Sequence, residues 1–203
     1  MAVLNEHSSE LVLKIAYHGP GLGGKTTNLS RICQFLPASR RGDLLTLDTL
    51  SERTLFFDFL LLKLGKLAGL ETSVHLYTVP GQSYYDASRK LILRGSDALV
   101  YVADSRKEAM KDNSASLDAL DADLRQLGLD PRALPRIVQF NKRDLKEALP
   151  LEELQAKLNP SGFPHVEAVA RHGFGVMETL HLALTLALGS IQYPGPALTE
   201  RAS

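Results

Sequence analysis

A glycine-rich turn between an apolar run and an amphipathic run constrains this chain more than any other feature. The apolar run LVLKIAYH is followed at once by GPGLGGKTTNL, which covers residues 19–29. This turn fits the pattern G-x-x-x-x-G-K-[ST], in the strand–turn–helix context that the pattern requires. The matching residues are Gly19, Gly24, Lys25 and Thr26. The turn therefore predicts a buried strand that leads into a helix, with a phosphate-binding loop between them.

The physical reason is the number of backbone N–H groups that such a turn can aim at one point. Glycines let the backbone fold inward, and the first N–H groups of the helix add free donors and partial positive charge. Lys25 would bridge the β- and γ-phosphates of a nucleotide, and the Thr26 hydroxyl would bind Mg²⁺. These two residues disfavour the alternative of a turn that binds nothing. The loop residues assigned to the nucleotide are Gly19, Gly21, Leu22, Gly23, Gly24, Lys25, Thr26 and Thr27.

Apolar and amphipathic runs alternate along the rest of the chain. Strands are predicted at 11–18, 43–47, 53–65, 72–79, 97–104, 136–140 and 165–170, and helices at 25–36, 84–95, 114–128, 150–158 and 175–188. This alternation is typical of an α/β fold with a mostly parallel sheet and helices on both faces. Residues 59–79 break the alternation, because a short glycine-containing stretch separates two strands there. They predict one antiparallel hairpin.

Composition limits the classes of protein that remain. The 203 residues suit one domain, predicted over 1–191, and the Pro-, Gly- and Ala-rich residues 192–203 are expected to be a disordered tail. The formal net charge is zero, so no field that would gather nucleic acid is implied. We expect no signal peptide and no membrane-spanning segment. A single cysteine, Cys33, fits a reducing compartment, and the expected location is the cytoplasm.

A second motif, FNKRDL, identifies the base of the nucleotide. Asn141, Lys142 and Asp144 form N-K-x-D at the end of a predicted buried strand. The Asp144 carboxylate would accept from both the N1–H and the 2-amino group of guanine, whereas adenine would leave it facing a lone pair. Asn141 would hold the base edge and the neighbouring loop, and the Lys142 stem would lie over the ring. Taken alone the motif is also compatible with an exposed charged turn, but downstream of a phosphate loop it predicts GTP and GDP as ligands.

The next predicted strand end adds a weaker candidate contact. In the segment EAVARHGFGV, the residues Val169 and Ala170 follow the strand, and the backbone N–H of Ala170 would contact the guanine oxygen. No side chain identifies this contact.

The order and spacing of the phosphate loop, the PGQ segment and N-K-x-D resemble those of the Ras-like small GTPases. The blocks GPGLGGKTTNL, RTLFFDF, HLYTVPGQ, YDASRKLILRG and NKRDL are similar to those of the MglA family of bacterial Ras-like GTPases, which control cell polarity and gliding motility. RTLFFDF and TVPGQ are the specific blocks, because many NTPases share the phosphate loop. The resemblance implies a Ras-like P-loop fold and a GTP-hydrolysing switch with two nucleotide-dependent surfaces.

The resemblance also implies roles around the metal. Thr78 occupies the position where most Ras-like proteins carry an aspartate that holds the Mg²⁺ water shell, a departure that is usual in MglA-like proteins. Asp58, on the neighbouring strand, is a candidate substitute; the alternative is a hairpin charge that faces solvent. Gly81 would sense the γ-phosphate through its N–H. Gln82 would orient the attacking water, unless it is simply an exposed loop residue.

The segment LSERTLFF is expected to be the first switch. Thr54 would supply the second hydroxyl to Mg²⁺. Arg53 resembles the arginine that MglA-like proteins are thought to use as an arginine finger from their own chain, and its alternative is a solvated loop arginine. The span from Lys25 to Thr54 is longer than in Ras, which fits an added strand or a shifted register before the hairpin.

Partners and alternative functions complete the expectations. MglA-like proteins are typically regulated by a small dimeric partner of the Roadblock type, MglB, which acts as a GTPase-activating protein; any polar location would come through partners. Two other functions remain open. One is a non-hydrolysing GTP-binding module used for assembly, which Thr78 leaves open while Arg53 and Gln82 oppose it. The other is a P-loop phosphotransferase acting on a small molecule, in which N-K-x-D would have no purpose.

Overall fold

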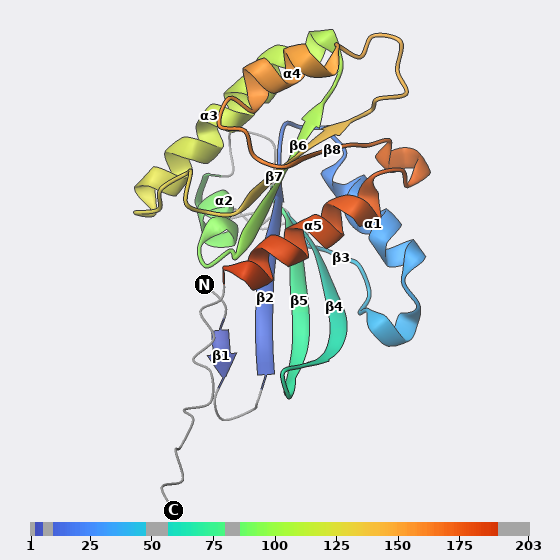
Figure 1. Ribbon diagram of the computed structural model, residues 1–203, viewed down its shortest axis with the longest axis vertical. Helices are drawn as coiled ribbons and strands as arrows, with labels where there is room; N and C mark the ends of the chain where they lie inside the picture. The colour runs from blue at the N-terminus through green and yellow to red at the C-terminus, as the bar shows by residue number, and fades with distance from the viewer. Residues whose placement is uncertain (1–2, 6–9, 48–56, 80–85, 191–203) are drawn as a thin grey trace, which may run out of the picture.

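The structure is a computed structural model that describes residues 3–5, 10–47, 57–79 and 86–190. Within these residues a single twisted sheet lies between two layers of helices (Figure 1). The predicted α/β class with a mostly parallel sheet is therefore confirmed.

The described strands form one eight-stranded sheet. They are β1 (Val3–Asn5), β2 (Glu10–His18), β3 (Leu45–Leu47), β4 (Phe57–Leu67), β5 (Leu70–Thr78), β6 (Ala98–Asp104), β7 (Arg136–Asn141) and β8 (His165–Glu167). The order is β3-β4-β5-β2-β6-β7-β8, with β1 paired to β2. Strands β5, β2, β6, β7 and β8 are parallel, whereas the β1–β2, β3–β4 and β4–β5 pairs are antiparallel.

The central strands explain why one edge of the sheet carries the site. Every residue of β6 and β7 is buried, as expected for parallel strands covered on both faces. Their carboxyl ends and that of β2 lie at the same edge. The chain there presents the glycine loop after β2, Asp104 at the end of β6 and Asn141 at the end of β7.

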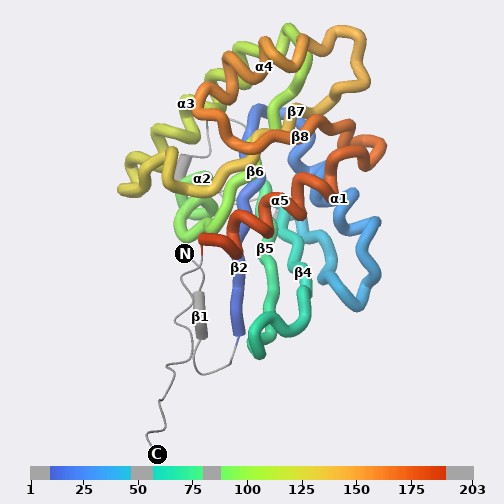
Figure 2. Tube along the Cα trace, in the orientation of Figure 1, coloured from blue at the N-terminus to red at the C-terminus, as the bar shows by residue number. Residues whose placement is uncertain are grey.

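Helices cover the two faces of the sheet. They are α1 (Lys25–Phe35), α2 (Asp86–Leu93), α3 (Met110–Gln126), α4 (Leu151–Leu158) and α5 (Val176–Gly189), with short 3₁₀ turns η1 (Ala38–Arg40), η3 (Lys107–Ala109) and η4 (Ala170–His172). On one face α1 and α5 pack beside each other against β2 and its neighbours, and the tube in Figure 2 shows α5 crossing the sheet. The other face packs against α2, α3 and α4. Among the described residues, no helix combines the length and the apolar character needed to cross a bilayer.

The hairpin and the added strand are both present. Strands β4 and β5 are joined at Ala68 and Gly69, whose φ angles of 50° and 88° turn the chain tightly. Strand β3 lies outside β4 at the sheet edge, so the long span before the hairpin contains an extra strand.

Three elements differ from the predictions. Strand β1 was not predicted, because three residues show no periodicity. Helix α3 begins at Met110 rather than at residue 114. The strand predicted at 165–170 ends at Glu167, and Ala170–His172 form a 3₁₀ turn, because the N–H of Ala170 donates to the Asn141 side chain instead of continuing a ladder.

A leucine pair in the hairpin tests the assignment of the core. Leu76 is 0% exposed and Leu67, near the turn, is 43% exposed. Leu76→Ala should lower the free energy of unfolding by about 2–5 kcal/mol, because it leaves a cavity in a packed core. Leu67→Ala should change it by less than about 0.5 kcal/mol. Urea unfolding under identical ligand conditions measures both, and equal losses would contradict the assignment.

Candidate functional site

The backbone of the glycine loop needs glycine at two positions. A Cβ on Gly19 would lie 2.2 Å from the Val102 carbonyl oxygen, and one on Gly24 would lie 2.2 Å from Asn141 Nδ2. Their φ angles, 145° and 108°, also favour glycine. Leu22 adopts a φ of 59° and is 90% exposed, so only its backbone faces the loop. The loop therefore approaches β6 and β7 more closely than any side chain would allow.

Free N–H groups line the start of α1. Gly24 is the N-cap and provides no side-chain cap, and the first turn holds no acidic residue. The first N–H in α1 with a backbone partner is that of Asn28, which donates to the Gly24 carbonyl at 3.0 Å. Within the described residues, the N–H groups of residues 24–27 have no acceptor. Four free donors at the positive end of a helix form an anion-binding site.

Lys25 is folded back over this loop. Its ammonium donates to the carbonyls of Gly19 at 2.8 Å and Pro20 at 2.7 Å. Burial lowers the pKa of Lys25 to about 8, and the Asp58 carboxylate opposes that shift. An ammonium has three donors, so two bonds hold Lys25 in place and the third is available to a phosphate.

Asp58 lies at the centre of three threonine hydroxyls. Its carboxylate accepts from Thr26 at 2.6 Å, from Thr78 at 2.9 Å and from Thr46 at 2.9 Å. The N–H of Asp58 also donates to the Thr78 hydroxyl at 2.8 Å. The side chain is buried, so the alternative of a hairpin charge facing solvent does not fit.

These oxygens suit a hard cation. Mg²⁺ prefers oxygen ligands and usually combines one or two carboxylates with substrate phosphates. In the part of the chain that the structure describes, no group of three or more His, Cys, Asp or Glu side chains is arranged so that it could hold a metal ion. The hydroxyl of Thr26 and the carboxylate of Asp58 are therefore suited to share a metal with bound phosphates rather than to hold one alone.

Asn141 joins the two predicted motifs. It is 2% exposed; its Nδ2 donates to the Gly23 carbonyl at 2.8 Å, and its Oδ1 accepts from the N–H of Ala170 at 2.9 Å. The expected contact with the neighbouring loop is present. Because the N–H of Ala170 has this partner, its contact with guanine stays a prediction. Val169 is bonded through its N–H to the Phe174 carbonyl, which closes the same turn.

Two residues of the site were not singled out from the sequence. Asp104 accepts from Lys142 Nζ at 2.7 Å and from the Arg106 guanidinium. Burial raises the pKa of Asp104, but the hydrogen bonds from Arg106 and Lys142 bring it below its usual value. Arg171 forms an ion pair of 3.6 Å with Asp144. The available signal for Asp104 was its position at the end of a predicted buried strand.

Four predicted residues lie outside the described residues: Arg53, Thr54, Gly81 and Gln82. Gly21 is described, and a Cβ there would meet no atom within 4 Å.

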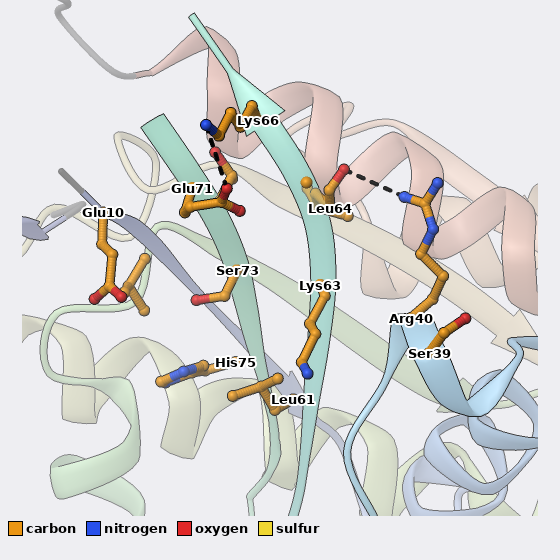
Figure 3. A pocket seen from close by; sticks show the side chains of 13 residues that line it. Glu10, Ser39, Arg40, Leu61, Lys63, Leu64, Lys66, Glu71, Ser73 and His75 are labelled. Carbon is orange, nitrogen blue, oxygen red and sulfur yellow. Dashed lines mark hydrogen bonds and ion pairs between the residues drawn. The ribbon is translucent and has the colours of Figure 1, made fainter. Parts of the chain in front are cut away.

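A second concave feature lies at the opposite end of the sheet. The hollow in Figure 3 is lined by Glu10, Lys63, His75 and others around the hairpin, whereas the glycine loop follows the other end of β2. Two of its charged side chains, Lys66 and Glu71, form an ion pair with each other at 3.8 Å. The hollow is therefore separate from the candidate nucleotide site.

The sheet order, the glycine loop with its free helix N-terminus, and the asparagine that ties this loop to N-K-x-D define a P-loop protein of the Ras-like class. No protein-family model matches the chain. The chain is 48% identical over 195 residues to the mutual gliding-motility protein MglA of Myxococcus xanthus (strain DK1622). The aligned residues cover 96% of this chain and 100% of that protein. The chain belongs to the MglA family of Ras-like small GTPases.

Two glycines of the loop give a matched test of its geometry. Gly24→Ala should lower the free energy of unfolding by at least about 1 kcal/mol, because its φ is positive and the new methyl group would meet Asn141. Gly21→Ala should leave it unchanged or raise it by up to about 1 kcal/mol, since the site is open. Urea unfolding without nucleotide measures both. A Gly24→Ala variant as stable as Gly21→Ala would show that the loop adopts another conformation.

Proposed function

We propose that the chain is a Mg²⁺-dependent, GTP-hydrolysing switch. The observation that carries this proposal is the Asn141 side chain, which bonds the phosphate loop at Gly23 and the turn at Ala170. One buried residue thus holds the phosphate-binding and base-binding segments at a fixed separation. This supports a ligand with both a guanine base and a phosphate chain.

Guanine recognition is assigned to Asp144. Its side chain is a quarter exposed and pairs with Arg171 at 3.6 Å, and the two oxygens of a carboxylate can accept from two guanine donors. Lys142, fixed by Asp104 at 2.7 Å, would line the base pocket with its stem. Adenine offers no matching pair of donors, so a preference for GTP and GDP over ATP follows.

Mg²⁺ would be held by the Thr26 hydroxyl and the β- and γ-phosphates, with Thr54 joining when GTP is bound. When bound, the ion would neutralise charge on the phosphates during transfer. Position 78 holds threonine where most Ras-like proteins carry the aspartate of the Mg²⁺ shell. Asp58 would take over that role, because its carboxylate already lies 2.6 Å from the Thr26 hydroxyl. One negative charge is thus kept beside the metal position.

Hydrolysis is assigned to Arg53 and Gln82. Arg53 lies five positions before Asp58 and Gln82 four positions after Thr78, and the Asp58 carboxylate accepts from both Thr26 and Thr78. Arg53 and Gln82 are thus only a few residues away in the chain from side chains at the candidate metal site. This short separation supports contact of both residues with the γ-phosphate. Gly81 would report the γ-phosphate through its N–H. Catalysis would consist of positioning water and stabilising charge.

The cellular role proposed is control of polarity or motility from the cytoplasm, through the two nucleotide states. The name of the Myxococcus xanthus relative supports the motility role. A Roadblock-type partner such as MglB would align Arg53 and Gln82, so unaided turnover would be slow. A single-turnover GTP assay separates this switch from a non-hydrolysing assembly module, and a titration of GTP against ATP separates it from a small-molecule phosphotransferase.

Asp144→Asn tests the base assignment. The substitution puts an amide donor opposite the 2-amino group of guanine, whereas xanthine has a carbonyl there. We expect guanine selectivity to collapse and binding of xanthosine diphosphate to rise, as measured by competition with a fluorescent nucleotide. Asp130→Asn, a change at an exposed carboxylate, is the control. If Asp144→Asn keeps full preference for guanine over xanthine, the base-site assignment is wrong.

Arg53→Ala tests the hydrolytic assignment. GTP and GDP affinity should stay nearly unchanged, because the contact forms mainly in the transition state. Partner-stimulated single-turnover hydrolysis should fall by roughly 10³–10⁵, the contribution of an arginine finger. Gln82→Ala should lower stimulated hydrolysis by a comparable factor. The double variant should hydrolyse GTP little more slowly than either single variant, since the two residues act as a unit. Arg132→Ala is the control. If stimulated turnover in Arg53→Ala stays within a few-fold of wild type, Arg53 is not an arginine finger supplied by the same chain.

A further inference from the structure

A polar network crosses the apolar core behind the phosphate loop. It consists of Asn28 on α1, Gln139 on β7 and Thr179 on α5, each 0% exposed. The two amides pair reciprocally: Asn28 Nδ2 donates to Gln139 Oε1 at 2.8 Å, and Gln139 Nε2 donates to Asn28 Oδ1 at 2.9 Å. Gln139 Nε2 also donates to the Thr179 hydroxyl at 2.8 Å. None of the three belongs to the two nucleotide motifs.

Every donor of this network is used. The second hydrogen of Asn28 Nδ2 goes to the Gly24 carbonyl at 2.9 Å, and the Thr179 hydroxyl donates to the Gly175 carbonyl at 2.7 Å. A buried amide left without a partner is destabilising, so alternative rotations of the Asn28 side chain are disfavoured. Gln139 thus fixes the direction in which Asn28 points.

That direction determines where the N–H groups of the phosphate loop point. In a planar trans peptide the carbonyl of one residue and the N–H of the next point in opposite directions. Asn28 holds the Gly24 carbonyl through its Nδ2 and its backbone N–H, so the N–H of Lys25 is turned to the opposite side. Asn141 holds the Gly23 carbonyl in the same way and turns the N–H of Gly24. Glycine peptides rotate easily, so these side chains supply the constraint that the glycines lack.

We propose that Gln139 is a positioning residue for phosphate binding, which locks the Asn28 amide onto the Gly24 carbonyl and thereby aims the N–H of Lys25 at the bound phosphates. This inference rests on the proposed nucleotide site. It assigns part of the phosphate affinity to a buried strand residue two positions before Asn141 that touches no ligand.

The variant Gln139→Met keeps the length of the side chain and removes its hydrogen bonds. We expect GDP to dissociate roughly three- to tenfold faster, the effect of misaligning one hydrogen bond to a phosphate. The preference for guanine over xanthine should be unchanged, because Asp144 and Asn141 are untouched. Release of a fluorescent GDP analogue by stopped flow gives the rate, and urea unfolding of each variant gives its stability.

Thr179→Val is the matched control. It removes the other partner of Gln139 while leaving the Asn28–Gln139 amide pair in place. It should lower stability as well, yet leave GDP release within twofold of wild type. If Gln139→Met releases GDP at the wild-type rate, or if Thr179→Val accelerates release equally, the inference is overturned.

A double variant guards against misfolding of Gln139→Met. Asn28→Leu with Gln139→Leu replaces both amides by apolar groups, a change that cores tolerate better than the loss of one partner. The double variant should fold and release GDP faster than wild type, and an unchanged rate would overturn the inference. A wild-type chain that binds no GDP would overturn the proposed function itself, which distinguishes the two failures.

Discussion

The side-chain amide of Asn141 donates to the carbonyl of Gly23 and accepts from the N–H of Ala170, so one buried residue joins three segments that are far apart in the chain. This contact is possible because Gly24 lacks a Cβ, which would lie only 2.2 Å from the amide nitrogen of Asn141. The alignment of β2 and β7 in one parallel sheet brings the segments within reach. The phosphate loop and the base motif thus form one unit rather than two neighbouring loops.

The same edge of the sheet supports the proposed replacement of a carboxylate across a strand pair. Thr78 ends β5, and Asp58 lies beside it near the start of β4, joined by two hydrogen bonds. Paired residues on neighbouring strands point to the same side of a sheet. A carboxylate on β4 can therefore contact Thr26 as one at the paired position on β5 would. The register of the hairpin, which joins Asp58 to Thr78, supports the proposal that Asp58 supplies the carboxylate that position 78 does not.

The sequence predicted those features whose determinants lie close together in the chain. The phosphate loop combines a strand, spaced glycines and a helix within about twenty residues, and the hairpin needs only two apolar runs around a glycine turn. The amide pair of Asn28 and Gln139 joins positions 111 residues apart, and each looks like an isolated polar residue in an apolar pattern. Asp104 is the last residue of the strand predicted at 97–104, but its contact with Lys142 depends on the pairing of β6 with β7. Tertiary pairing of this kind has no local periodicity.

The outer edge of the sheet has a consequence for association between molecules. Strand β4 carries the run FLLL, and an uncovered strand of this composition would be a template for β-sheet aggregation. Strand β3 pairs with its first residues, the N–H of Gly42 bonds the Leu61 carbonyl at 2.8 Å, and the Arg40 guanidinium reaches the Leu64 carbonyl at 3.4 Å. Beyond them the ladder between β4 and β5 shifts register between Lys63 and Gly65, which increases the local twist. Residues 40–47 thus cover part of a leucine-rich strand edge and reduce its capacity to pair with another chain, while Thr46 of the same segment also bonds Asp58.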